Sequence, residues 1–192
     1  MKELLIYIVS NIVEHPEDVV VTEEATDEDA RLCLTKALRW SIAVNESITR
    51  LPEDLKLPFP GAKEGLVAAS AFADVAVVSS ANRDAVEEEW EKYGLLSHTD
   101  ILLAQDCGSK SSCIAKMLEY GYPKDHVLMV GDAPGDCDAA EKNGVWFYPI
   151  LVGWEEESWK GLVESALPLL RSCSYESCQE EKKQVFVENL GG

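Results

Sequence analysis

The stretch Val127-Leu-Met-Val-Gly-Asp-Ala-Pro-Gly-Asp136 decides the fold. Four apolar residues followed at once by Gly131 and Asp132 are typical of a parallel strand leaving a buried sheet. The next aspartate, Asp136, adds a second carboxylate at the carboxyl end of that strand, where open α/β sheets bind ligands. Two such carboxylates repel unless a cation lies between them, and oxygen donors suit Mg²⁺. We therefore predict Asp132 and Asp136 as Mg²⁺ ligands, with a solvated turn as the alternative interpretation.

The pattern around this stretch alternates between short apolar runs and helical periods. Glycines close three of the helical periods, as expected at helix C-termini. The alternation predicts a Rossmann-like α/β core with a parallel sheet and right-handed crossovers. The expected strands are 75–78, 101–104, 127–130 and 145–149, and the expected helices are 62–73, 83–93, 111–120, 137–143 and 155–171.

A different rhythm precedes the Pro- and Gly-containing break at Leu57-Pro-Phe-Pro-Gly61. Thr26-Asp-Glu-Asp29 resembles a capping box, and it predicts a helix that runs to about Arg50. The apolar side of that helix would carry Leu34, Leu38, Trp40 and Ile42. Residues 3–14 fit either a helix or a strand. We therefore divide the chain into a helical unit (1–57), an α/β core (58–172) and a polar C-terminal tail (173–192).

Composition excludes several classes of partner. The net charge of −18 argues against nucleic acid and anionic membranes. None of the six cysteines forms a Cys-x-x-Cys pair, which predicts reduced thiols and a cytoplasmic protein. The N-terminal apolar run is far too short to span a bilayer and lacks a signal-peptide cleavage pattern, so we expect no membrane anchor.

Two other expected strands also end in polar residues. Ser79-Ser-Ala-Asn82 follows the strand 75–78 and offers hydroxyl and backbone N–H donors to a phosphate, with helix capping as the alternative. Lys110 follows the strand 101–104 and can neutralise a phosphoryl group, although a surface lysine is the simpler interpretation. Because parallel strands share one carboxyl edge, we predict Ser79, Ser80, Asn82 and Lys110 as substrate-binding residues beside Asp132 and Asp136.

This ordered set resembles the haloacid dehalogenase-like (HAD) hydrolase superfamily, most of whose members are Mg²⁺-dependent phosphatases. The resemblance covers about residues 55–153 and rests on Phe59-Pro-Gly61, Val75-Ala-Val-Val-Ser-Ser80, Gly108-Ser-Lys110 and Gly131-Asp-Ala-Pro-Gly-Asp136. It implies that Ser79 holds a phosphoryl oxygen and that Lys110 stabilises its charge, so both are implied catalytic residues. It also implies that Asp132 ligates Mg²⁺ and that Asp136 supports the metal directly or through water.

The sequence departs from the family at its nucleophile, an aspartate in an Asp-x-Asp motif at the end of the first strand. The N-terminal run ends Ile8-Val-Ser-Asn-Ile12, without a carboxylate, and Asp27-Glu-Asp29 suits a helix N-terminus better. An aspartyl-phosphate cannot form without the nucleophile, and loss of a general acid alone costs ~10²–10⁴-fold in rate. We expect residues 1–57 to be the remnant of a helical cap, the chain to begin inside that cap, and the chain alone to be inactive.

The predicted function is therefore that of a HAD-like hydrolase acting on a small phosphorylated metabolite. The alternative is a non-catalytic regulatory module that binds phosphate and metal, and the simplest interpretation is a set of caps and surface charges. The missing central strand can be replaced by residues 4–9, by another chain, or by rearrangement of the sheet. A sheet without its middle strand favours association into a homo-oligomer.

Overall fold

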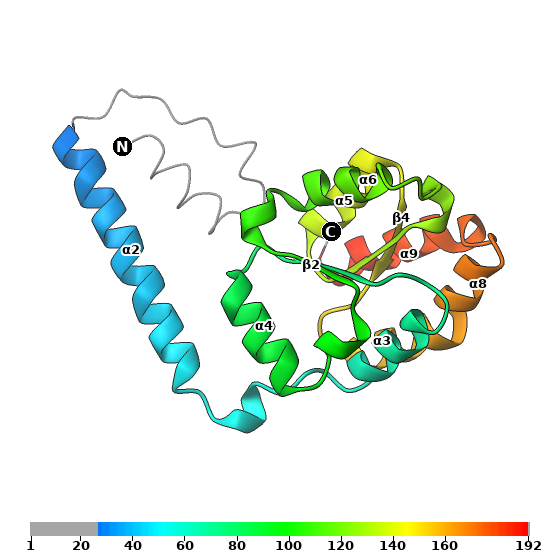
Figure 1. Ribbon diagram of the computed structural model, residues 1–192, viewed down its shortest axis with the longest axis horizontal. Coiled ribbons are helices and arrows are strands. Elements are labelled where there is room, and N and C mark those ends of the chain that lie inside the picture. The colour runs from blue at the N-terminus through cyan, green and yellow to red at the C-terminus, as the bar shows by residue number, and fades with distance from the viewer. Residues whose placement is uncertain (1–26, 192) are drawn as a thin grey trace. The chain divides into compact units, whose positions relative to one another are not determined.

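A computed structural model describes residues 27–191 of the chain (Figure 1). The chain divides into two compact units after Leu57, and each unit is described by itself. The predictions for residues 3–14 and for Thr26 lie outside the described residues.

The first unit contains one long helix. Helix α2 spans Asp27–Thr49 and is followed by the short 3₁₀ helix η2, Glu53–Leu55. Asp27-Glu-Asp29 begins α2, so these residues open a helix and do not follow a strand. On the predicted apolar side, Leu34 is buried, whereas Leu38, Trp40 and Ile42 are exposed.

The second unit is a Rossmann-like α/β core built on two parallel strand pairs. Strand β1 (Ala76–Val78) pairs with β2 (Ile101–Leu103), and Val77 lies opposite Leu102. Strand β3 (Leu128–Gly131) pairs with β4 (Trp146–Pro149), with Met129 opposite Phe147. Each end of the four strands lies within one residue of its predicted position, because short apolar runs between helical periods have few other conformations open to them.

Helices connect the strands and continue beyond the last one. The connecting helices are α3 (Ala62–Ser70), α4 (Arg83–Lys92), α5 (Lys110–Leu118) and α6 (Pro134–Asn143), and short 3₁₀ turns lie at η3 (Leu96–His98), η4 (Gln105–Cys107) and η5 (Lys124–His126). The predicted helix 155–171 is helical throughout, as α7 (Glu155–Gly161), a π-helical turn (Leu162–Ala166) and α8 (Leu167–Arg171). Among residues 27–191, no helix is both long and apolar enough to cross a membrane.

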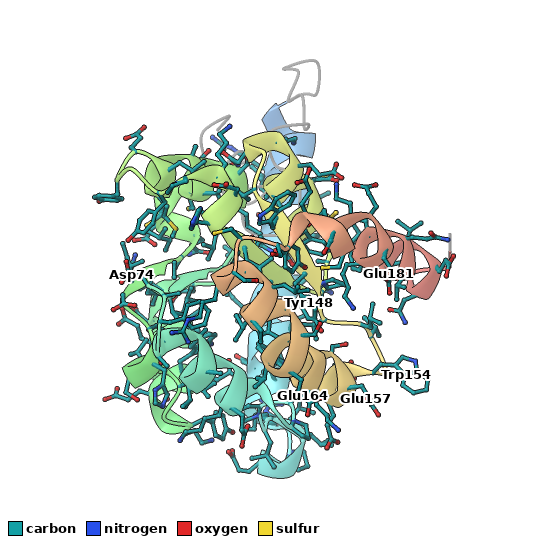
Figure 2. The ribbon with its side chains drawn as sticks, turned by 90° about the vertical axis from the view of Figure 1, so that its right-hand side faces the viewer. Asp74, Tyr148, Trp154, Glu157, Glu164 and Glu181 are labelled. Carbon is teal, nitrogen blue, oxygen red and sulfur yellow. The ribbon has the colours of Figure 1, made fainter. Side chains whose placement is uncertain are left out.

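Strand β4 organises the core because its side chains alternate between two faces. Phe147 packs with Ile114 of α5 and Phe186 in one buried cluster. Tyr148 packs in a second cluster with Leu162 and other residues of the α7–α8 segment. Figure 2 shows Tyr148 beside this segment, where its hydroxyl donates to the Ser158 carbonyl oxygen at 2.7 Å. Burial on both faces explains why β4 reads as a continuous apolar run.

The expected polar tail contains a helix, α9, which spans Glu176–Asn189. It packs against β4, as Figure 1 shows. The backbone N–H of Phe147 donates to Gln179 Oε1 at 3.0 Å, and its carbonyl oxygen accepts from the Tyr175 hydroxyl at 2.8 Å. These side chains satisfy backbone groups of β4 that the β3 ladder does not use, so the C-terminal segment covers the outer edge of the sheet.

Candidate functional site

A pocket of about 260 Å³ lies within the second unit, between β1 and β3. Val77 and Val78 line it from β1, and Met129 and Val130 line it from β3. No hydrogen-bonded ladder joins these two strands in the described part of the chain. The pocket therefore lies between the two strand pairs, with an apolar wall from each.

Polar residues from three strand ends line the same pocket. They are Ser79 and Ser80 after β1, Lys110 after β2, and Asp132 and Asp136 after β3. These five residues were predicted as site residues because the carboxyl ends of parallel strands share one edge. The structure brings all five together.

Ser79 continues the line of β1 into the pocket. Its backbone N–H donates to the Leu103 carbonyl oxygen at 2.9 Å, which extends the β1–β2 ladder by one bond. Its hydroxyl oxygen accepts from the Ala81 N–H at 3.1 Å. This bond uses the oxygen as an acceptor, so the Ser79 O–H remains able to donate to an anion.

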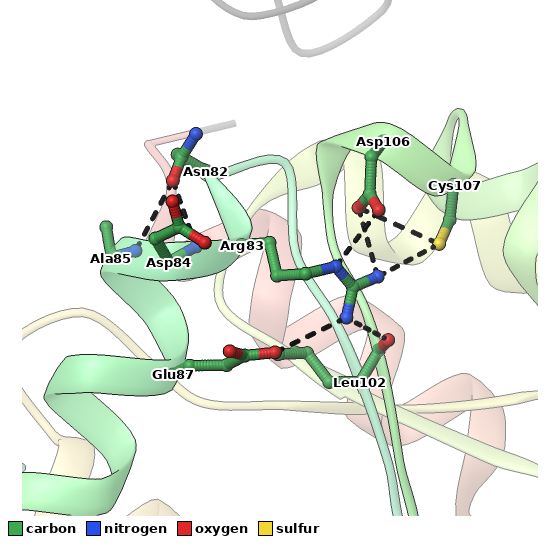
Figure 3. A network of polar contacts seen from close by, with 8 residues as sticks. All are labelled: Asn82, Arg83, Asp84, Ala85, Glu87, Leu102, Asp106 and Cys107. Atoms are coloured by element: carbon green, nitrogen blue, oxygen red, sulfur yellow. Dashed lines mark hydrogen bonds and ion pairs between the residues drawn. The ribbon is translucent and has the colours of Figure 1, made fainter.

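Asn82, the sixth predicted residue, has a different position. It is not among the residues that line the pocket. Its Oδ1 accepts from the N–H groups of Asp84 at 3.0 Å and Ala85 at 3.4 Å, as Figure 3 shows. Asn82 is thus the N-cap of α4, which was the alternative interpretation of this segment.

Arg83 connects the start of α4 to the loop before Lys110. Its Nε and Nη2 donate to the two oxygens of Asp106 at 3.0 and 3.1 Å, and Nη1 donates to the Leu102 carbonyl oxygen at 3.2 Å (Figure 3). The hydrogen bond from Arg83 lowers the pKa of Asp106. A two-pronged pair of this kind fixes geometry as well as charge, so it supports the loop that leads to α5.

Lys110 is the first residue of α5, one residue earlier than the predicted helix start. The Ser109 hydroxyl caps this helix by accepting from the Ser112 N–H at 3.2 Å. Lys110 Nζ donates to Asp136 Oδ1 at 2.6 Å. The cap and the ion pair place the lysine cation inside the pocket, where it can face an anionic ligand.

Asp136 is almost completely buried, with 3% of its surface exposed. Its Oδ2 accepts from the Ala133 N–H at 3.2 Å, and its Oδ1 accepts from Lys110. The side chain lies in the first turn of α6, where the helix dipole favours negative charge. These three contributions offset the cost of burying a carboxylate.

Gly131 allows Asp136 to take this position. A Cβ added to Gly131 would lie only 2.4 Å from Cγ and Oδ2 of Asp136. Real side chains cannot approach so closely, so only glycine fits at the end of β3. The glycine therefore belongs to the site, a role that the Gly-Asp-x-x-x-Asp spacing alone did not reveal.

Asp132 is exposed at the mouth of the pocket, directly after β3. Together with Asp136 it offers carboxylate oxygens, the donors that Mg²⁺ prefers, and Mg²⁺ bound to proteins commonly keeps several waters and only one or two carboxylates. The donor set fits such an ion. Among the described residues there is no group of three or more His, Cys, Asp or Glu side chains that could hold a metal.

Helix α4 contributes two pocket residues that the sequence analysis missed, Val86 and Trp90. They lie four residues apart, so they share one face of the helix. This spacing was visible in the sequence, but an apolar pair on a helix is more often core than part of a ligand site. The pocket thus joins an apolar lining to a polar rim.

Two parallel strand pairs, with hydroxyl, lysine and carboxylate groups at the carboxyl ends of three strands, define a Rossmann-like α/β protein with a polar pocket. The chain belongs to the haloacid dehalogenase-like hydrolase family, whose family model matches residues 9–150.

Two further comparisons give a limited result. The structure search matches the crystal structure of a HAD-superfamily hydrolase of subfamily IA, variant 1, from Geobacter sulfurreducens PCA. The two sequences are 17% identical, and the TM-score between the structures is 0.46. That match covers 77% of this chain and 80% of the other chain. The comparison with curated proteins finds no match.

Proposed function

We propose that the pocket is a Mg²⁺-dependent phosphoryl site for a small phosphorylated metabolite in the cytoplasm. The observation that supports this proposal is the convergence of Ser79, Lys110, Asp132 and Asp136 on one pocket. A hydroxyl donor, a cation and two carboxylates are the groups that hold a phosphate beside a divalent metal.

Each residue has a separate role in this proposal. Asp132 would ligate Mg²⁺, and Asp136 would support the metal directly or through water, with further waters completing the coordination. The Ser79 hydroxyl donates to one phosphoryl oxygen, and the Lys110 ammonium faces another while it remains paired with Asp136. Bound Mg²⁺ would supply charge stabilisation to the phosphoryl group.

We infer that the described residues bind this ligand but do not turn it over. Asp132 and Asp136 are the carboxylates that line the pocket in residues 27–191. The Asp136 oxygens already accept from Lys110 and Ala133, and Asp132 is needed for the metal. A nucleophilic carboxylate would therefore have to be added to the described site.

The space between β1 and β3 is the place from which such a carboxylate could be supplied. These strands present apolar side chains to the pocket and share no ladder with each other among the described residues. A strand placed there would pair with both neighbours, and its carboxyl end would face Ser79 and Asp132. A nucleophilic aspartate at that end would lie beside the phosphoryl group.

A non-catalytic module that binds phosphate and metal is the second candidate. The observation that favours it is the engagement of Asp136 with Lys110, which makes this carboxylate unsuitable as a nucleophile. Binding without turnover is what distinguishes a regulatory module from an enzyme.

The experiment is hydrolysis of p-nitrophenyl phosphate with Mg²⁺, by the chain alone and with a synthetic peptide added. The peptide has an apolar β-strand sequence that ends in Asp-x-Asp, and its control ends in Asn-x-Asn. We expect turnover only with the Asp-x-Asp peptide and Mg²⁺, and loss of that turnover in Asp132→Asn. Turnover by the chain alone that is lost in Asp132→Asn would contradict the inferred inactivity, but it would support the proposed Mg²⁺-dependent phosphatase activity. Failure of every combination, with Mg²⁺ still bound, would support the regulatory module.

A further inference from the structure

A second cluster of reactive side chains lies apart from the pocket, at the junction of η5 and the end of α8. It consists of Asp125 and His126 from η5, and of Cys173, two residues after α8 ends. None of the three lines the pocket. Asp125 and His126 are 47 or more residues from Cys173 in the sequence, so spacing could not have revealed the cluster.

The three side chains form a continuous chain of contacts. His126 Nδ1 lies 2.9 Å from Asp125 Oδ1, and His126 Nε2 lies 3.2 Å from Cys173 Sγ. An ionised carboxylate only accepts hydrogen bonds, so a neutral imidazole beside it carries its hydrogen on Nδ1. The lone pair of Nε2 then faces the thiol, and the S–H of Cys173 donates to it. This tautomer makes His126 a base for Cys173.

The backbone holds Cys173 in an unusual conformation. Its φ of +55° is the one positive value among the non-glycine residues that the structure describes. Its N–H donates to the Leu170 carbonyl oxygen at 3.0 Å, and the N–H of Ser174 donates to the Leu169 carbonyl oxygen at 2.9 Å. A non-glycine residue held in this region carries strain, which is often stored at functional sites.

Hydrogen bonds also hold the segment that carries Asp125 and His126. Trp146 Nε1 donates to the Asp125 carbonyl oxygen at 2.9 Å, which ties η5 to strand β4. The backbone N–H of His126 donates to the Pro123 carbonyl oxygen at 2.9 Å and closes the turn. The imidazole and the thiol are therefore presented to each other by two ordered segments of the same unit.

The other five cysteines lack this environment. Cys107 is half-buried, and its sulfur accepts from Arg83 Nη2 at 3.4 Å and lies 3.8 Å from Asp106 Oδ1, so it contacts an ion pair rather than an imidazole. Burial raises the pKa of the Cys113 and Cys178 thiols, and it raises the pKa of Cys137 to about 11. Cys33 is exposed, as Cys173 is, but within the described residues no imidazole lies against its sulfur. Exposure and an imidazole in contact with the sulfur thus occur together at Cys173 among the described residues.

We propose that Cys173 is a thiol-modification site, at which His126 activates the sulfur for exchange with a small disulfide. The S–H proton moves to His126 Nε2, and the thiolate attacks one sulfur of the disulfide. A new bond forms between Cys173 Sγ and that sulfur, the original S–S bond breaks, and the leaving thiolate takes the proton from His126. Asp125 orients the imidazole through its contact with His126 Nδ1. The carbonyl groups at the end of α8 oppose a thiolate, but their effect is diffuse, whereas the imidazolium is in direct contact.

The test measures how fast each cysteine reacts with glutathione disulfide in the full chain, by mass spectrometry of peptides after quenching. Cys33 is the matched control in the same sample. Because His126 is placed to take the proton of Cys173 as the sulfur attacks, and the described residues place no imidazole against Cys33, we expect Cys173 to react roughly three- to tenfold faster than Cys33.

Two variants separate activation from simple exposure. His126→Gln should reduce the Cys173 rate to that of Cys33 and leave the Cys33 rate unchanged, and Asp125→Asn should give an intermediate rate. Equal rates for Cys173 and Cys33 in the parent protein would overturn the proposal without any variant. So would a Cys173 rate that is unaffected in a folded His126→Gln protein.

Discussion

Lys110 Nζ lies 2.6 Å from Asp136 Oδ1, and this ion pair joins the first residue of α5 to the first turn of α6. The lysine side chain is 21% exposed and the aspartate side chain only 4% exposed. Most of the pair is therefore screened from water, so each charge is compensated mainly by the opposite charge of its partner. The pair holds two strand ends of the pocket in one arrangement before any ligand binds.

The substitution Lys110→Met should destabilise the protein, because it leaves the Asp136 carboxylate buried without its cation. We expect the free energy of unfolding in urea to fall by about 3 kcal/mol. Lys160→Met is the matched control, since Lys160 pairs with Glu164 at 4.0 Å on the exposed surface, and loss of such a pair costs less than about 1 kcal/mol. Equal losses in the two variants would show that the buried pair does not stabilise the fold.

Gly131→Ala should displace the Asp136 member of the same pair, because the new Cβ would overlap the Asp136 side chain. Overpacking of this kind costs about 1–3 kcal/mol. In an Asp136→Ala background the overlap disappears, so the same glycine substitution should cost less. Urea unfolding of both single variants and the double variant measures this difference. Additive effects would contradict the close approach.

The cap at Asn82 can be separated from ligand binding. Asn82→Ala should lower the free energy of unfolding by about 1 kcal/mol, because two N–H groups of α4 lose their acceptor. Asn82→Asp keeps an acceptor oxygen and should retain most of the stability. Phosphate affinity, measured by calorimetry with Mg²⁺, should be unchanged in both. A loss of phosphate affinity in Asn82→Asp would place Asn82 in the site after all.

The Arg83–Asp106 pair predicts a dependence of stability on pH. The pKa of Asp106 is lower in the folded protein than its usual value, mainly because Arg83 donates to it. The stabilisation from this pair is therefore fully present above the unfolded pKa of about 3.9, and it is lost as pH falls through the lower, folded pKa. The stability difference between the parent and Asp106→Asn should be constant from pH 7 to pH 5 and shrink in acid. A difference that stays constant down to pH 2 would refute this account.

The sequence predicted the strand ends well because the physical rule behind them is local. A short apolar run followed by Gly and Asp has few conformations available, and parallel strands bring their carboxyl ends to one edge. For this reason Ser79, Lys110 and Asp132 were expected to lie together without knowledge of any contact, and all three line the pocket.

Other features depend on contacts between distant residues and could not be predicted. Helix α9 was missed because its segment is polar, and Gln179 is buried through a hydrogen bond to Phe147 rather than through apolar packing. The overlap between Gly131 and Asp136 depends on the path of the chain after β3. Asn82 could cap a helix or bind a ligand, and only the positions of Asp84 and Ala85 decide between these roles.

Calorimetric titration of Mg²⁺ into the parent chain and into Asp132→Asn tests the proposed site most directly. Asp84→Asn is the control, because Asp84 is an exposed aspartate on α4 that does not line the pocket. We predict that the parent and Asp84→Asn bind Mg²⁺ equally and that Asp132→Asn loses this binding. Equal binding by all three proteins would mean that the ion is held elsewhere on this acidic chain, and the proposed metal site would be wrong.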